Sequence, residues 1–108
     1  MNTQEEIKTP LRLSKELDFK SGEVVAKDVF SNANGGVRLL AFDKGAMLAR
    51  HQAPGDVLVY LIEGTVEFEV DDTRQHLESG DSILLPAGTP HTVLALAPSR
   101  VLLTRINA

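Results

Sequence analysis

The sequence contains no cysteine. Disulfide bonds, thiolate metal sites and cysteine nucleophiles are therefore excluded. No apolar run comes near the roughly 20 residues that span a bilayer. Residues 1–8 are polar and acidic, without the apolar core of a secretion signal. These absences predict a cytoplasmic protein with no membrane partner.

Positive charge is in the minority, with eleven Lys and Arg against fifteen Asp and Glu. Nucleic-acid binding draws most of its affinity from neutralised phosphates, so this balance argues against a nucleic-acid partner. The 108 residues suit a single domain, and a hydrophobic content of 43% is enough for a core. The expected partners are a small molecule and a second copy of the chain.

Sustained helical periodicity is missing as well. Residues 1–20 are predicted to form an N-terminal arm, with Ser14 as the cap of at most one short helical turn. Residues 21–108 carry short apolar runs separated by turn signals such as Asn34-Gly35-Gly36, a pattern typical of an all-β sandwich or barrel. The predicted strands span residues 23–30, 37–42, 46–51, 57–62, 65–70, 73–77, 82–85, 91–97 and 101–106.

Two of these runs predict which faces are buried. Residues 65–70 alternate strictly, so Val66, Phe68 and Val70 are expected inside. Residues 57–62 are apolar on both faces and should be covered on both sides. Because an uncovered apolar strand favours aggregation, we expect a homodimer that buries strands from the N-terminal half. The alternative is a monomer in which residues 1–20 fold back over the exposed face.

Two segments resemble the paired motifs of the cupin superfamily. Residues 45–64 resemble the first motif, which ends in Gly after a His-x-His pair and a Glu. Residues 80–95 resemble the second motif and keep every position except its final Asn, where Ala95 stands. The matching residues are Gly45, His51, Gly64, Gly80, Pro86, Gly88 and His91. The resemblance covers most of residues 45–95 and implies a cupin jelly-roll barrel, also called a double-stranded β-helix, over residues 21–108.

The resemblance also implies where a metal would bind. A metal-binding cupin supplies three His and one carboxylate, and the matching positions here are His51, Ala53, Val57 and His91. Two imidazoles remain, whereas catalytic metal sites usually take at least three protein ligands. A divalent transition metal (Zn, Fe, Ni or Mn) would be held by His51 and His91 with non-protein ligands, and by Asp56 only if a bulge turned it inward. Otherwise both histidines are hydrogen-bonded polar groups at a pocket mouth.

The motif positions predict an apolar pocket with both imidazoles facing each other at its mouth. Its expected lining is Met47, His51, Val57, Val59, Leu61, Phe68, His91 and Val93. An apolar cup with few polar groups favours a small-molecule-binding domain. The alternative is a cupin enzyme of isomerase or oxygenase type, metal-dependent or metal-free, with His51 and His91 as candidate catalytic residues. A third interpretation is a barrel that acts mainly as a dimer scaffold. The chain also resembles a group of single-domain bacterial cupins with no settled activity, so whether it is an enzyme stays open.

Overall fold

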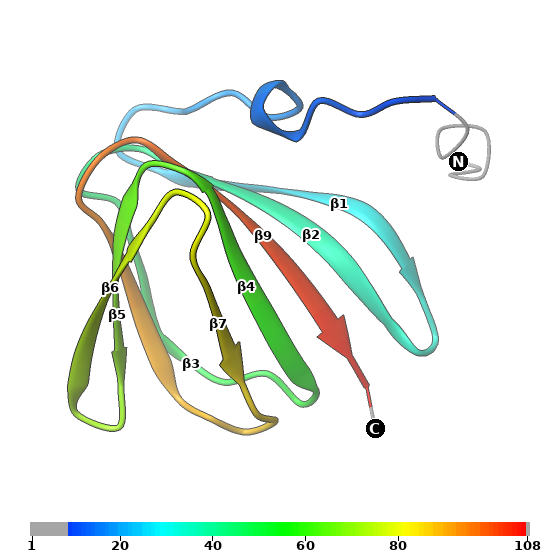
Figure 1. The fold of residues 1–108 in the computed structure, drawn as a ribbon, viewed down its shortest axis with the longest axis vertical. Coiled ribbons are helices and arrows are strands. Elements are labelled where there is room, and N and C mark those ends of the chain that lie inside the picture. Colours follow the sequence, from blue (N-terminus) through cyan, green and yellow to red (C-terminus); the bar gives the residue numbers. More distant parts are fainter. Residues whose placement is uncertain (1–8, 108) are drawn as a thin grey trace.

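The computed structural model describes residues 9–107 and confirms the all-β prediction (Figure 1). Each predicted strand is present, with its ends shifted by at most two residues. The strands are β1 (Val24–Asn32), β2 (Gly35–Phe42), β3 (Met47–His51), β4 (Asp56–Glu63), β5 (Thr65–Val70), β6 (Thr73–Glu78), β7 (Ser82–Leu85), β8 (His91–Ala95) and β9 (Ser99–Ile106). Within the described residues, helix is limited to the single 3-10 turn η1 (Leu13–Lys15), and nothing helical is long and apolar enough to cross a membrane.

The strands form two antiparallel sheets. Sheet A has the order β1-β2-β9-β4-β7, and sheet B has the order β3-β8-β5-β6. The strands converge at the upper end of Figure 1 and spread toward the lower end, where β3 leads into β4. The inward-facing side chains of both sheets therefore form one core between them.

Alternation along the strands supplies this core. Val66 and Phe68 are 0% and 1% exposed, as their positions in the sequence predict, and Val70 packs half-buried at the edge. The core cluster consists of Leu40, Phe42, Ala46, Val57, Val59, Leu61, Val66, Phe68, Leu77, Leu85, Val93, Ala95 and Val101. On β4 the odd-numbered residues point inward, which leaves Leu58 and Tyr60 on the outer face.

Ser99 joins the two sheets at the converging end. It begins β9 of sheet A and is completely buried. Its hydroxyl accepts a hydrogen bond from the backbone N–H of Thr65, the first residue of β5 in sheet B, at 3.1 Å. The hydroxyl also lies 2.7 Å from the carbonyl oxygen of Ala97, to which it donates. A buried hydroxyl with both roles satisfied costs little and ties β5 to β9.

The N-terminal arm begins its contacts with sheet A through η1. The helical turn starts at Leu13, and its N-cap is Arg12 without a side-chain hydrogen bond. The prediction that Ser14 caps the turn is therefore wrong: Ser14 lies inside the turn, because the N-cap falls two residues earlier than the sequence pattern suggests. Residues 1–8 of the predicted arm lie outside the described residues.

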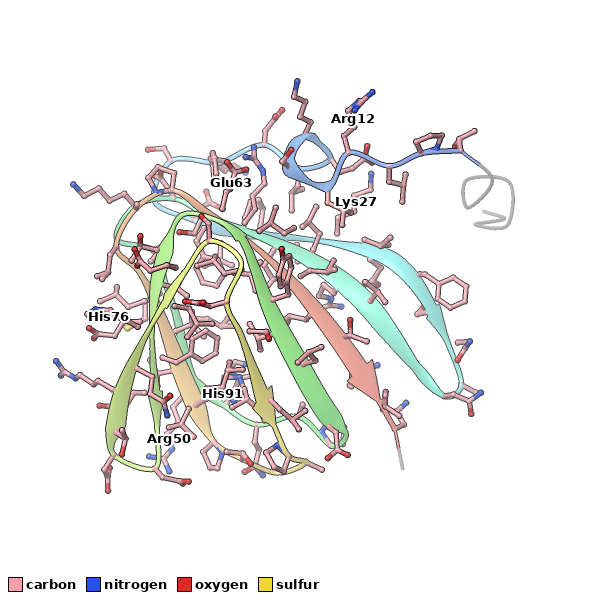
Figure 2. The ribbon with its side chains drawn as sticks, in the orientation of Figure 1. Arg12, Lys27, Arg50, Glu63, His76 and His91 are labelled. Atoms are coloured by element: carbon pink, nitrogen blue, oxygen red, sulfur yellow. The ribbon has the colours of Figure 1, made fainter. Side chains whose placement is uncertain are left out.

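Arg100 of β9 anchors the arm to the outer face of sheet A. Its Nε donates a hydrogen bond to the carbonyl oxygen of Leu17 at 2.9 Å, and its guanidinium lies 4.1 Å from the ring centroid of Phe19. Its other partner is the carboxylate of Glu63 at the end of β4. Lys27 of β1 adds an ion pair with Glu16 of the arm at 3.1 Å, and Lys27 and Glu63 lie on the side of the sheet along which the arm runs (Figure 2).

The arm explains why part of the outer face is buried. Leu39 and Ala41 alternate with the inward-facing Leu40 and Phe42, so they point outward, yet both are 0% exposed. Leu39 pairs with Lys27 of β1, and Ala41 pairs with Arg100 of β9, the two residues that hold the arm. Glu16, Leu17 and Phe19 of the arm therefore lie along this part of the face, and the monomer covered by residues 1–20 stays a prediction.

The outer face of β4 and β7 remains uncovered. Leu58, Tyr60 and Leu84 are 44%, 41% and 63% exposed, and Leu58 pairs directly with Leu84. Apolar side chains gathered on one sheet face are typical of an interface.

The homodimer stays a prediction, and light scattering at micromolar concentration tests it. We expect twice the single-chain mass of 11.7 kDa and a buried interface above roughly 1,200 Å² in total. Leu84→Glu should return the mass to that of one chain, because a carboxylate would be desolvated at the interface. Wild-type protein that scatters as one chain would instead support the monomer with a folded-back arm.

Gly64 and Gly80 give a matched test of the Ser99 contact at the converging end of the sheets. Both have positive φ, at 100° and 94°. A Cβ at Gly64 would lie 2.2 Å from Oγ of Ser99, whereas a Cβ at Gly80 meets nothing within 4 Å. In urea denaturation, Gly80→Ala should lower the free energy of unfolding by about 1–2 kcal/mol through backbone strain. Gly64→Ala should lose about 1–3 kcal/mol more, because Ser99 must move. Equal losses would show that the sheets do not depend on this contact.

Candidate functional site

A bulge in β3 sets the direction of the side chains at the spreading end. Leu48 pairs with Val93 of β8, and His51 pairs with His91, so three steps along β3 match two along β8. The extra residue places Leu48 and His51 on the same, inward face. Simple alternation from His51 instead predicts Met47 inside. That prediction is wrong, because Met47 lies before the bulge and is 58% exposed.

The two imidazole rings meet at this end of the barrel. Their centroids lie 4.1 Å apart, with an interplanar angle of 60° in an edge-to-face arrangement. His91 is 7% exposed, lies between the sheets (Figure 2), and stacks at 6.1 Å on the ring of Phe68. His51 is exposed. The site therefore has one buried and one solvent-facing imidazole in contact.

The same kind of backbone contact orients both rings. Nδ1 of His51 lies 3.0 Å from the carbonyl oxygen of Ala49, and Nδ1 of His91 lies 3.0 Å from that of Thr89. A carbonyl oxygen only accepts hydrogen bonds, so each Nδ1 carries the proton. In a neutral ring the lone pair is then on Nε2, which is left to accept a hydrogen bond from a ligand.

Burial lowers the pKa of His91 below its ordinary value of 6.5. Desolvation is the main cause, because it disfavours the charged imidazolium. The hydrogen bond to Thr89 acts in the opposite direction, and the neighbouring His51 adds a smaller lowering effect on this pKa. His91 is therefore neutral at pH 7.

A cavity of about 360 Å³ opens between the sheets beside this pair. Of the predicted lining, the residues that contribute are His51, Val57, Val59, Phe68, His91 and Val93. Leu61 does not line it, because this side chain is fully buried deeper in the core. Further apolar lining comes from Leu40, Phe42, Leu48, Val101 and Leu103. The cavity is thus an apolar cup, and the role of each residue in binding stays a prediction.

Sequence reasoning missed the polar rim of this cavity. Its charged residues are Asp28, Arg38 and Arg105, all from sheet A, and Ser31 and Gln52 add neutral polar groups. A signal was available in the sequence. Arg38 lies two residues before the inward-facing Leu40, and Arg105 lies two residues after Leu103. Residues two apart on a strand share a face, so both arginines continue the inward face beyond the core.

The donor set does not fit a resident metal ion. Ala53 and Val57 stand where the motif has ligands, and both line the cavity as apolar side chains. Asp56 is exposed outside the cavity, where its Oδ1 accepts a hydrogen bond from the N–H of Ala87 at 2.8 Å. Among residues 9–107, no group of three or more His, Cys, Asp or Glu is close enough to share an ion. The two imidazoles fall short of the three protein ligands typical of catalytic sites.

The buried imidazole predicts a pH effect on stability. Because the unfolded chain protonates His91 at a higher pH than the folded protein does, its contribution is complete above 6.5 and is lost as the pH falls through the lowered folded pKa. Thermal unfolding between about pH 8 and pH 5.5 should show a larger loss for wild type than for His91→Asn. Parallel pH curves for the two proteins would show that His91 is protonated equally in the folded and unfolded states.

Comparison with known proteins agrees with the architecture. A search of curated proteins gives no match. Among solved structures, a conserved protein of unknown function from Streptococcus pyogenes is 26% identical with a TM-score of 0.86, covering 93% of this chain and 88% of that one. An RmlC-like cupin from Desulfovibrio desulfuricans is 26% identical with a TM-score of 0.82, covering 91% and 95%. A cupin superfamily protein from Desulfitobacterium hafniense, 19% identical with a TM-score of 0.88 over 94% and 93%, shows the shared fold.

The family model of the cupin domain matches residues 38–104, which include both histidines and all of sheet B. This match spans more than half of the 108 residues. The jelly-roll arrangement of the two sheets and the edge-to-face histidines at the spreading end agree with it. The chain belongs to the cupin domain family.

Proposed function

We propose that this cupin binds a small molecule in the cavity between its sheets. The observation that carries the proposal is the cavity itself, about 360 Å³ in volume with an apolar wall and polar groups confined to one end. Ligand pockets are commonly apolar cups of roughly 300–1,000 Å³ in which a few polar groups fix the ligand's orientation. An apolar body would enter the cup, and the Nε2 atoms of His51 and His91 would accept hydrogen bonds from its polar end.

A second candidate function is acid–base catalysis without a metal. It is favoured by the neutral state of His91 at pH 7, which follows from its lowered pKa and gives a ring able to take a proton. Against it, the Nδ1 atoms of both rings contact backbone carbonyls rather than carboxylates. A carboxylate partner would stabilise the imidazolium formed during proton transfer, and a carbonyl does so less effectively. Binding is therefore the function that the site supports better.

Neighbouring positions on β3 provide a test of binding with a matched control. Leu48 lines the cavity, whereas Met47 is 58% exposed on the other side of the strand. In Leu48→Trp the indole would occupy the cavity, and in Met47→Trp it would project into solvent. We expect wild type and Met47→Trp to bind the neutral dye N-phenyl-1-naphthylamine with equal affinity. Leu48→Trp should bind the dye at least about tenfold more weakly.

The measurement is the fluorescence increase of the dye on titration with protein, with circular dichroism confirming that both variants are folded. Equal binding by the two variants would contradict the proposal, because the dye would then occupy another surface. The exposed apolar patch around Leu84 is the surface that such a result would point to.

A further inference from the structure

The rim of the cavity carries its own charge pattern, distinct from that of the whole protein. The charged residues that line it are Asp28, Arg38 and Arg105. Counting Asp28 as −1 and each arginine as +1, the formal charges of these three residues sum to +2 − 1 = +1. The chain as a whole has a formal net charge of −4 at pH 7 when histidine is counted as neutral. The cavity mouth is therefore locally positive in an acidic protein, which favours an anionic ligand there.

The two arginines differ in what already neutralises them. Nε of Arg38 lies 2.8 Å from Oδ1 of Asp28, and these residues are paired across β1 and β2. Arg105 has no ion pair or side-chain hydrogen bond among residues 9–107. One guanidinium at the mouth is thus compensated, and the other is available to a ligand.

The position of Arg105 aims it at the same cavity that the histidines line. It lies on β9 two residues after Leu103 and four after Val101, and all three line the cavity, as strand alternation requires. Arg105 also pairs with Val57, a buried residue of the cavity wall. Sheet A therefore places a free guanidinium at the mouth, while sheet B supplies the two imidazoles.

We infer that the ligand is a small monocarboxylic acid with an apolar body, held by Arg105 at the rim. This inference rests on the proposed binding function. A guanidinium binds a carboxylate through two parallel N–H···O bonds, and one uncompensated positive charge matches one carboxylate rather than a doubly charged phosphate. The apolar cup accepts the remainder of the molecule.

The test compares acids with their own primary amides, which have nearly the same shape but no charge. The probes are phenylacetate and hexanoate, each measured against phenylacetamide and hexanamide by NMR titration of ¹⁵N-labelled protein at low ionic strength. For wild type we expect each acid to bind about tenfold or more tightly than its amide, as for a charge-assisted hydrogen bond. Low salt is needed because Arg105 is exposed and screening weakens such contacts.

Two variants separate recognition from a general charge effect. Arg105→Gln should reduce the preference to less than about twofold, mainly by weakening the acids, because the amides lose only a hydrogen bond to a neutral acceptor. Arg74→Gln removes the same charge on the outer face of sheet B, where Arg74 lies 3.9 Å from Glu67 and 3.8 Å from Glu69, and should keep the wild-type preference.

Each result has a distinct meaning. Amides and acids that bind equally to wild type would overturn the carboxylate inference and leave small-molecule binding intact. A preference that survives in Arg105→Gln would overturn the assignment of Arg105. If neither acids nor amides bind, and Leu48→Trp binds the neutral dye as tightly as Met47→Trp does, the binding function is overturned and this inference with it.

Discussion

The hydroxyl of Ser99 is the contact on which the shape of the barrel depends. It bridges the first residue of β9 to the first residue of β5, so it holds the two sheets together at one end without a covalent link. Gly64 packs directly against it, at a distance that leaves no room for a side chain. With this end filled and fixed, the space between the sheets widens toward the other end, where the cavity and the two histidines lie. Burying a hydroxyl without hydrogen-bond partners costs free energy. The Ser99 hydroxyl is therefore stable only in the arrangement of β5 and β9 that supplies its partners.

The polarity of the inward-facing side chains changes along strand β9, which begins at Ser99. Its inward-facing residues are Ser99 at the closed end, Val101 and Leu103 along the apolar wall, and Arg105 at the rim. Because β9 lies between β2 and β4 in sheet A, its register fixes what faces it from both neighbours. Over the seven residues from Ser99 to Arg105, the inward side chains change from a polar anchor to apolar lining and then to a cation. A ligand that is apolar at one end and anionic at the other would match this order of environments.

Sequence reasoning succeeded where periodicity and turn residues decide the structure, and failed where one residue breaks the period. Alternation in residues 65–70 identified the buried Val66 and Phe68, and the glycine-bounded runs identified every strand. The bulge in β3 has no signature in its own side chains, since it is set by pairing with β8, and so Met47 was placed inside in error. The arginines at the rim were missed because an arginine in a strand is usually expected to face solvent. The available signal was their spacing of two residues from inward-facing apolar residues on the same strand.

The positions that resemble the metal-ligand positions of the family pattern lie together in the cavity. His51, Ala53, Val57 and His91 stand at the positions that resemble ligands, and all four line one cavity, so the backbone still brings the ligand positions together. Ala53 and Val57 carry methyl groups at two of those positions, where the pattern has lone pairs. An ion there would lose hydration without gaining enough donors, a cost that apolar ligand atoms do not incur. The two substitutions therefore extend the apolar wall up to the imidazoles. The remaining polar groups, two oriented rings and one uncompensated guanidinium, suit recognition of a polar end group better than coordination of an ion.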